Sequence, residues 1–398
     1  MPFFFSIITL PVIYLIGKIT FGKRTGIVLL IFFTFSFYFV YFSSVLKVYS
    51  QLMFCQSVFL LLFIRKYIYG EKNKLIYLIF GIVSFATDYS FIWLFLSLTA
   101  FIIISRFTAR QIPKKFSSGR KINEKKILLV HFLIILCGLP WIPKYLNKLK
   151  EYKGLEWLSP LSLSDIANGF MRYFGLNYSI LNNYIFQIPF LIFVAIIILL
   201  VVFKIVISPR YRCRLLFLLI LLIPYTIIIL INCFVPFYAD YHLMIVTISL
   251  FIFLSLVLQY WSKAGMILLV MFLIINLYSF DNFLREEPFQ DWQALSNYIT
   301  LAYPNQEVVL YMYPFVFRSP LNYYQKLMGK SNNKPVIFYA LGVPAFSQKV
   351  KNICIINRTY GNSTVEKLAQ SAKKQLNEKY LANGHKLFGK IELSCYTK

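Results

Sequence analysis

Apolar runs dominate the first 280 residues of the chain. About ten stretches rich in Phe, Ile, Leu, Val and Tyr follow one another, and short polar segments separate most of them. A helix needs about 20 apolar residues to cross a bilayer. The pattern therefore predicts a polytopic α-helical membrane protein with about ten transmembrane helices. We expect these helices at residues 3–17, 26–43, 48–64, two within 75–105, 127–143, 186–207, 215–235, 241–260 and 264–280.

Lysine and arginine are concentrated on alternate sides of the predicted helices. Segments 65–74 and 106–126 are both strongly basic, and basic loops stay on the cytoplasmic side. The stretch 75–105 between them must therefore leave the cytoplasm and return as two short helices. Its turn at Thr87-Asp88-Tyr89 then lies at the outer face. The same count places the N-terminus and the residues after 281 outside the cytoplasm.

The apolar pattern stops at residue 281, which predicts two domains: a transmembrane domain at 1–281 and an extracytoplasmic domain at 282–398. Helix-like and strand-like segments alternate in the second domain, and this alternation is typical of a small α/β fold. No glycine-rich phosphate loop opens any of its helices, so a nucleotide-binding fold is not indicated. We expect helices at 291–301, 320–327 and 364–380, and strands at 307–313, 335–341, 353–357 and within 387–396.

The overall composition agrees with a membrane location. Hydrophobic residues make up 59% of the chain and the mean hydropathy is +0.67, which is too apolar for a soluble protein of 398 residues. The net charge of +26 is explained by cytoplasmic loops and a general preference for lysine. We therefore expect membrane lipids, and no nucleic acid, as partners.

Charged residues near a bilayer are costly and usually mark a functional site. Lys47, Asp88, Asp240 and His242 all fall at the predicted outer face, and the loop 144–173 adds several lysines together with Arg172. A basic rim suits a lipid phosphate, and a carboxylate within it can act as a general base toward a hydroxyl group. The alternative interpretation is that these residues are solvated loop charges and helix-end anchors.

Histidine and cysteine offer little further chemistry. No His/Cys cluster has the spacing of a structural zinc site; a divalent metal ion as cofactor stays open. His131 lies in an apolar run and is expected to be packed or to cap a helix, and His385 in Asn-Gly-His predicts a turn. Cys354 and Cys395 fall on predicted strands, and whether they form a disulfide depends on an oxidising compartment.

Several segments, in this order, resemble one family of membrane enzymes. Phe42-Ser-Ser-Val-Leu-Lys-Val-Tyr-Ser50 is similar to its tyrosine-serine-x-glutamate-x-arginine-x-tyrosine-serine motif, and Thr87-Asp88-Tyr89 is similar to its threonine-histidine-tyrosine turn. Weaker similarities are found at 10–24, 234–242 and 291–299. The chain thus resembles the polyprenyl-phosphate-sugar-dependent C-type glycosyltransferases, which include protein mannosyltransferases, lipid A aminoarabinose transferases and rhizobial core glycosyltransferases.

The resemblance implies sugar transfer at the outer membrane face, and the heavy use of Ile, Lys, Phe and Tyr suggests a bacterial inner or plasma membrane. The donor would be a sugar on a polyprenyl phosphate, and the acceptor would be a lipid, glycan or protein hydroxyl group. Lys47 takes the position of an arginine that would hold the donor phosphate, Tyr49 would line the same pocket, and Asp88 stands where the family has a histidine. The implied substrate-binding residues are Lys47, Tyr49, Tyr89, Tyr241, His242 and Arg172, and the candidate catalytic residues are Asp88 and Asp240.

The chain also departs from the family. Val45 replaces the glutamate of the first motif, and Asp240 replaces an arginine before Tyr241. The family places its catalytic aspartate in a first outer loop, whereas Met1 aligns with the start of the second span. Three interpretations follow: a truncated or mis-started product, a degenerate relative, or a member that uses Asp88 or Asp240 instead.

A non-enzymatic protein of glycan export, such as a flippase, transporter or assembly scaffold, is the alternative function. A transporter would need polar residues at mid-depth or broken helices in paired halves. Charges within the predicted spans are nearly absent and no internal repeat is evident. The sequence therefore favours transfer at the membrane surface over passage through the membrane.

Overall fold

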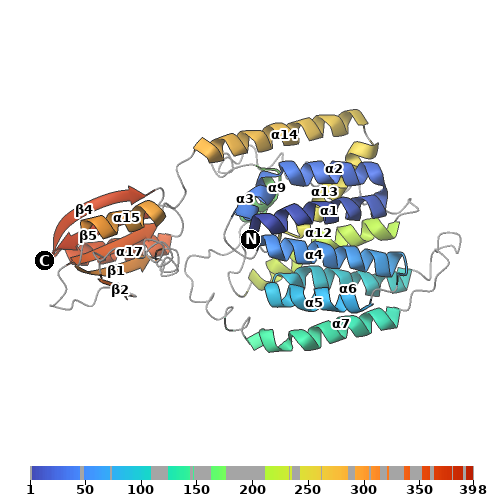
Figure 1. Cartoon of the computed structure of the whole chain (residues 1–398), viewed down its shortest axis with the longest axis horizontal. Coiled ribbons are helices and arrows are strands. Elements are labelled where there is room, and N and C mark those ends of the chain that lie inside the picture. The colour runs from blue at the N-terminus through green and yellow to red at the C-terminus, as the bar shows by residue number, and fades with distance from the viewer. Residues whose placement is uncertain are drawn as a thin grey trace. The chain divides into compact units, whose positions relative to one another are not determined.

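The computed structural model describes residues 2–44, 49–71, 74–108, 124–143, 147, 163–175, 211–232, 234, 243–260, 262–285, 292–303, 306–313, 321, 336–340, 352–358, 363–378, 380–388 and 391–397. These residues form two compact units that divide between Asn282 and Phe283. The described part of the first unit is helical, and the second unit contains a sheet with helices (Figure 1).

The first unit contains helices of very different lengths. Its α-helices are α1 (Pro2–Phe21), α2 (Lys23–Phe35), α3 (Phe37–Ser44), α4 (Tyr49–Phe63), α5 (Lys74–Thr87), α6 (Phe91–Thr108), α7 (Glu124–Gly138), α9 (Leu163–Tyr173), α12 (Tyr211–Asn232), α13 (Val246–Tyr260) and α14 (Ser262–Arg285). A π-helical turn, η1 (Ile64–Ile68), continues α4, and a short 3-10 turn, η3 (Leu139–Trp141), follows α7.

Three helical segments are long and apolar enough to cross a membrane: Phe3–Phe21, Tyr49–Ile68 and Arg212–Asn232. The bent pair of α2 and α3 would be a fourth. Five other apolar helices have 10–17 residues, and a 15-residue helix is only about 22 Å long. The described residues therefore contain fewer full-length spans than the ten that the pattern predicts, and the predicted span 186–207 lies outside them.

The predicted division of 75–105 into two helices is confirmed. α5 ends at Thr87, α6 begins at Phe91, and Asp88 lies in the turn between them. The single helix predicted at 26–43 is instead broken at Ser36, where α2 and α3 meet at 59°. The hydrophobic pattern does not reveal this break because the apolar run continues through Ser36 on both sides.

The basic ends of the helices gather at one end of the first unit. Tyr69, just after η1, donates a hydrogen bond to the carbonyl of Ile19 near the end of α1. Other contacts at this end are Tyr67 to Ser105 at 3.4 Å, Thr25 to Gln259 at 3.3 Å, and Arg214 to the Tyr260 hydroxyl. Segments far apart in the sequence thus bring their lysines and arginines to the same end, as the charge pattern predicts.

Two features hold the helices of the first unit together. α13 is buried on all sides from Val246 to Val257, as expected for a helix that is apolar all round. α1 and α2 meet at two glycines: a Cβ added to Gly17 would lie 2.9 Å from the Cα of Gly26. Small residues of this kind let the backbones of membrane helices approach closely.

The second unit is an α/β fold (Figure 1). Its strands are β1 (Glu307–Tyr313), β2 (Val336–Ala340), β3 (Asn352–Arg358), β4 (Leu381–Phe388) and β5 (Ile391–Thr397), in the spatial order β2-β1-β3-β5-β4. β1 pairs in parallel with β2 and β3, whereas β5 pairs antiparallel with β3 and β4. Helix α15 (Trp292–Ala302) packs on one face of the sheet and α17 (Ser363–Asn377) on the other.

The sequence pattern predicts most of the described elements of this unit. Both helices and the first three strands fall at their predicted places. The pattern fails at β4, because its first six residues are exposed or half-buried and lack apolar alternation. His385 lies within β4 and not in the predicted turn. Of the predicted helix 320–327, only Leu321 is among the described residues.

Candidate functional site

The residues that the sequence singles out fall into two groups. Tyr49, Asp88, Tyr89 and Arg172 belong to the described part of the chain. Lys47, Asp240, Tyr241 and His242 lie outside the described residues. The geometry of the candidate site is therefore built from the first group and from the side chains that contact it.

Asp88 caps a helix. Its Oδ1 accepts the backbone N–H of Ser90 at 2.8 Å, and its carbonyl oxygen accepts the N–H of Phe91 at 3.2 Å. A carboxylate at this position satisfies N–H groups that the first turn of α6 leaves without helical partners. Asp88 is half-buried, so the cap uses one carboxylate oxygen of a residue that water can still reach.

Gln56 on α4 contacts the same turn, and the sequence analysis missed it. Its Nε2 donates to the carbonyl of Ser90 at 3.4 Å, while its Oε1 is buried and has no hydrogen-bond partner among the described residues. A buried acceptor without a donor costs about 1–3 kcal/mol. The turn that carries Asp88 and Tyr89 therefore lies beside a carboxamide oxygen that can still accept a hydrogen bond. The available signal was a glutamine, one of two in α4, inside a largely apolar run.

A row of aromatic rings joins Tyr49 to the helix that carries Arg172. The Tyr49 ring contacts Phe42, with centroids 5.3 Å apart, and Phe42 contacts Tyr38 at 4.7 Å. Tyr38 contacts Tyr173 at 4.9 Å, and Tyr173 follows Arg172 directly in α9. Tyr49 and Arg172 are thus brought to one end of the unit. The turn that carries Asp88 contacts α4 about two helical turns further along, where the carbonyl of Ser90 accepts from Gln56.

The row continues to α12 and α13. The Tyr225 hydroxyl donates to the Tyr173 hydroxyl at 3.3 Å, and Tyr173 donates to the carbonyl of Leu243 at 3.5 Å. The ring of Phe170 stacks on Tyr225 at 4.6 Å. Leu243 follows His242 in the sequence, so these contacts tie α9 to the described residue that comes directly after the predicted Asp240-Tyr241-His242 segment.

Asn276 is the second residue that the sequence analysis missed. It is fully buried on α14, and its Oδ1 accepts the N–H of Phe37 at 2.6 Å. Its Nδ2 donates to the carbonyl of Phe174 at 3.0 Å and to that of Phe272 at 2.8 Å. One carboxamide thereby joins the start of α3, the end of α9 and α14. The signal was a single polar residue inside an apolar run.

Gly175 completes this junction. Its φ of +86° lies in the left-handed region that favours glycine. A Cβ at this position would also overlap the Asn276 carboxamide. The Ser279 hydroxyl donates to the carbonyl of Gly175, so α14 contacts the end of α9 through two side chains.

His131 belongs to a separate buried chain of hydrogen bonds. The Thr99 hydroxyl donates to the carbonyl of Phe95 at 2.9 Å, so its oxygen accepts from Nδ1 of His131, 2.9 Å away. Nε2 of His131 then accepts from the Tyr77 hydroxyl at 2.6 Å. Both ring nitrogens have partners, which agrees with the packed histidine that the sequence predicts.

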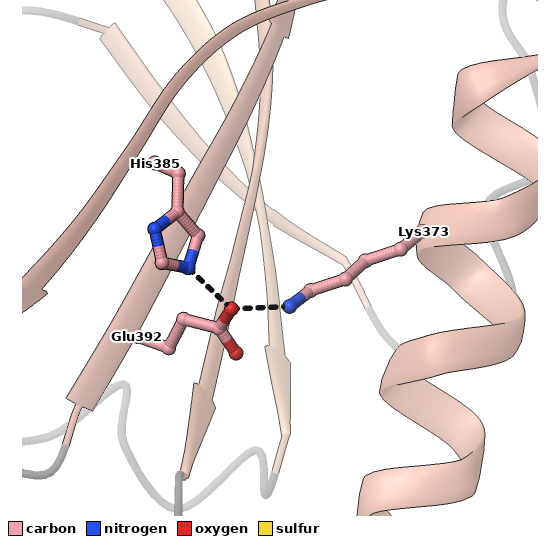
Figure 2. Close-up of polar contacts among 3 residues, drawn as sticks. All are labelled: Lys373, His385 and Glu392. Atoms are coloured by element: carbon pink, nitrogen blue, oxygen red, sulfur yellow. Dashed lines mark hydrogen bonds and ion pairs between the residues drawn. The ribbon is translucent and has the colours of Figure 1, made fainter.

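The second unit contains a polar cluster of three residues on two strands and a helix. Figure 2 shows Glu392 on β5 between Lys373 on α17 and His385 on β4, each with a nitrogen 2.6 Å from Oε1 of Glu392. Burial raises the pKa of the Glu392 carboxyl group, but hydrogen bonds and charge from Lys373 and His385 outweigh burial and hold this pKa below its ordinary value. The cluster fixes α17 and β4 to β5.

A disulfide joins Cys354 on β3 to Cys395 on β5. This settles the pairing that the sequence left open. Among the described residues, no group of three or more His, Cys, Asp or Glu side chains could hold a metal ion. The described candidate site therefore consists of aromatic rings, a capping carboxylate, an arginine and two carboxamides.

Comparisons with models of protein families, with curated proteins and with solved structures gave no match. The described structure is mostly helical, with some helices long and apolar enough to cross a membrane, and it includes a small α/β unit. The likeness to glycosyltransferases rests on the sequence motifs alone.

Proposed function

We propose that this chain is a membrane glycosyltransferase that moves a sugar from a polyprenyl-phosphate donor to a lipid, glycan or protein hydroxyl group. One observation carries the proposal: Tyr49 and Arg172 lie at the end of the first unit opposite to the basic ends, and the Asp88 turn lies beside Gln56, about two helical turns along α4 from Tyr49. α4 runs from Tyr49 to the π-helical turn with Arg65, and α5 runs from Lys74 to the Asp88 turn. The basic end suits the cytoplasmic side, so the opposite end suits an outer-face reaction.

The proposed topology keeps about ten spans, with the bilayer thinned locally around the shorter apolar helices. α14 begins at Ser262 beside Lys263, at the basic end, and the chain leaves its other end for the second unit. The disulfide of the second unit supports an extracytoplasmic location because disulfides persist in oxidising compartments.

In the proposed reaction, Lys47 and Arg172 hold the donor phosphate. Arginine does so through a planar fork and lysine as a point charge. A carboxylate, Asp88 or Asp240, takes the proton of the acceptor hydroxyl group. The oxygen of that hydroxyl group bonds at the same time to the anomeric carbon of the sugar. The bond from that carbon to the phosphate oxygen breaks, and polyprenyl phosphate leaves with both bonding electrons.

Tyr49, Tyr89, Tyr241 and His242 are proposed to line the donor pocket. The aromatic row from Tyr49 to Tyr173 supports this assignment, because aromatic rings provide apolar surface beside a polar hydroxyl group.

A protein of glycan export is the second candidate, and the break between α2 and α3 favours it. Transporters build substrate sites from discontinuous helices, and the 59° bend at Ser36 is such an interruption. This function would move a lipid-linked glycan across the bilayer without breaking the bond from sugar to phosphate.

Purified protein in lipid nanodiscs tests the proposal. A panel of labelled undecaprenyl-phosphate hexoses and aminopentoses is offered with a lipid acceptor extract, and released undecaprenyl phosphate is measured. Release by the wild type and its loss in Lys47→Ala support transfer. Intact donor throughout, with movement of labelled lipid across proteoliposome membranes, would contradict transfer and support export.

A further inference from the structure

The geometry points to Asn276 as a positioning residue of the donor site. Its carboxamide fixes the end of α9, which carries Arg172, to the start of α3, whose Tyr38 contacts the aromatic row that reaches Tyr49. This inference rests on the proposed function for its chemical meaning. Asn276 itself lies on α14 and acts through these two segments.

The break at Ser36 creates the need for such a residue. Where α2 ends, the N–H of Ser36 still bonds the carbonyl of Phe33 at 3.4 Å. The N–H of Phe37 has left the helical pattern and bonds Oδ1 of Asn276 instead. The hydrogen bond from Phe37 to Asn276 therefore supports the bend, together with the Ser36 hydroxyl oxygen, which accepts the N–H of Phe39 at 3.3 Å.

The other half of the carboxamide holds α9. Nδ2 bonds the carbonyl of Phe174, two residues after Arg172, and Ser279 bonds the carbonyl of Gly175. The left-handed conformation of Gly175 lets the chain turn against Asn276 with no Cβ in the way. Any shift of the end of α9 therefore moves Arg172 with it.

α3 and α9 also touch each other directly, through the Tyr38 and Tyr173 rings. Ring contacts tolerate sliding, whereas the two hydrogen bonds of one carboxamide fix a single register. Because Asn276 bonds both the start of α3 and the end of α9, it fixes the distance between these two helices. Binding groups misplaced by about 1 Å lose much of their effect, so loss of this register should weaken donor binding.

The test compares Asn276→Leu, the milder Ser279→Ala and the control Asn232→Leu in nanodiscs. Asn232→Leu makes the same amide-to-leucine change on α12, where Nδ2 of Asn232 donates to the carbonyl of Ile228 at 2.8 Å. We expect Asn276→Leu to raise the KM for labelled undecaprenyl-phosphate sugar about tenfold while kcat changes less than about twofold. Ser279→Ala should shift KM in the same direction by less, and Asn232→Leu should leave it unchanged.

A distance measurement separates this inference from the proposed function. Spin labels at Asn168→Cys on α9 and Tyr41→Cys on α3, with Cys137 and Cys233 replaced by alanine, report the separation of the two helices. A narrow distance distribution that broadens in Asn276→Leu but not in Asn232→Leu supports the inference even if the wild type transfers no sugar. An unchanged distribution, or a lower melting temperature with unchanged KM in an active protein, overturns it.

Discussion

Cys354 and Cys395 lie directly opposite each other in the register of β3 and β5, and a disulfide joins them. Both are buried in the cluster between the sheet and α15, beside Leu393 and Ile356. The sequence places both cysteines on strands, but only the register shows that they face each other. A disulfide in this unit is the structural feature that bears most directly on its compartment.

Removal of the disulfide should destabilise the second unit. The bond spans 41 residues, and a loop of that size is worth about 4 kcal/mol through the entropy of the unfolded chain. Cys354→Ala/Cys395→Ala should therefore unfold at a lower urea concentration than the wild type in pulse proteolysis of the full chain. A thiol reagent that labels both cysteines in unreduced protein isolated from the cell would contradict the disulfide.

Reporter fusions test the orientation of the chain. A fusion after residue 115 lies in the predicted basic loop 106–126, and a fusion after residue 320 lies in the second unit. Positive loops stay inside, so the first should report the cytoplasm and the second the outer side. The reverse result would place the candidate site on the wrong side of the membrane for this account.

Glu392→Gln should weaken the contact of β5 with α17 and β4 in a pH-dependent way. The pKa of Glu392 lies below its ordinary value of 4.5, so its ionised form stabilises the fold. That contribution is present above about pH 4.5 and is lost as the pH falls through the lower pKa of the folded state. We expect Glu392→Gln to lose about 1 kcal/mol at pH 7, and the difference to shrink as the pH falls below 4.5.

Hydrogen exchange in β4 and β5 of the whole protein measures this effect. Lys374→Gln, an exposed change on the same helix, is the matched control and should leave the exchange unaltered. A difference between Glu392→Gln and the wild type that stays constant from pH 7 to pH 3 would show that charge is not involved.

Tyr77→Phe should destabilise the first unit. The change removes the Tyr77 hydroxyl group that donates to Nε2 of His131. A buried acceptor without a donor costs about 1–3 kcal/mol. Thermal unfolding in nanodiscs measures the loss, with Tyr278→Phe as control because Tyr278 is 54% exposed. Equal melting temperatures for the two variants would mean that the hydrogen-bond chain through His131 does not support the fold.

The charge pattern predicts more of this structure than the apolar pattern does. Basic flanks correctly divide 75–105 into α5 and α6, because lysines and arginines on both sides of one apolar stretch require it to return to the side where it started. At the break, the N–H of Phe37 bonds Asn276, which is 239 positions away. Ser36 caps α3 locally through its hydroxyl oxygen, which accepts the N–H of Phe39, but no local pattern reveals the contact with Asn276.

The candidate site likewise combines residues that the sequence identifies with contacts that only the packing of distant helices creates. Short motifs point to Tyr49 and Asp88, and the basic loop 144–173 points to Arg172. The aromatic row that connects Tyr49 with α9 forms only when distant helices pack. Gln56 and Asn276 are hard to find from sequence. An amide side chain within an apolar run can be buried or can face outward, and the sequence does not distinguish the two. β4 was missed because an exposed edge strand needs no apolar alternation.

Sugar transfer by aspartate variants tests the central claim most directly. Asparagine at position 88 keeps an oxygen that caps α6 but cannot take a proton, so Asp88→Asn separates catalysis from folding. Asp240→Asn is compared in the same assay, and Asp281→Asn on α14 is the control. The account predicts that one of the first two variants slows release of undecaprenyl phosphate by about 10²–10⁴-fold, while Asp281→Asn transfers normally. Wild-type rates in both Asp88→Asn and Asp240→Asn would contradict it.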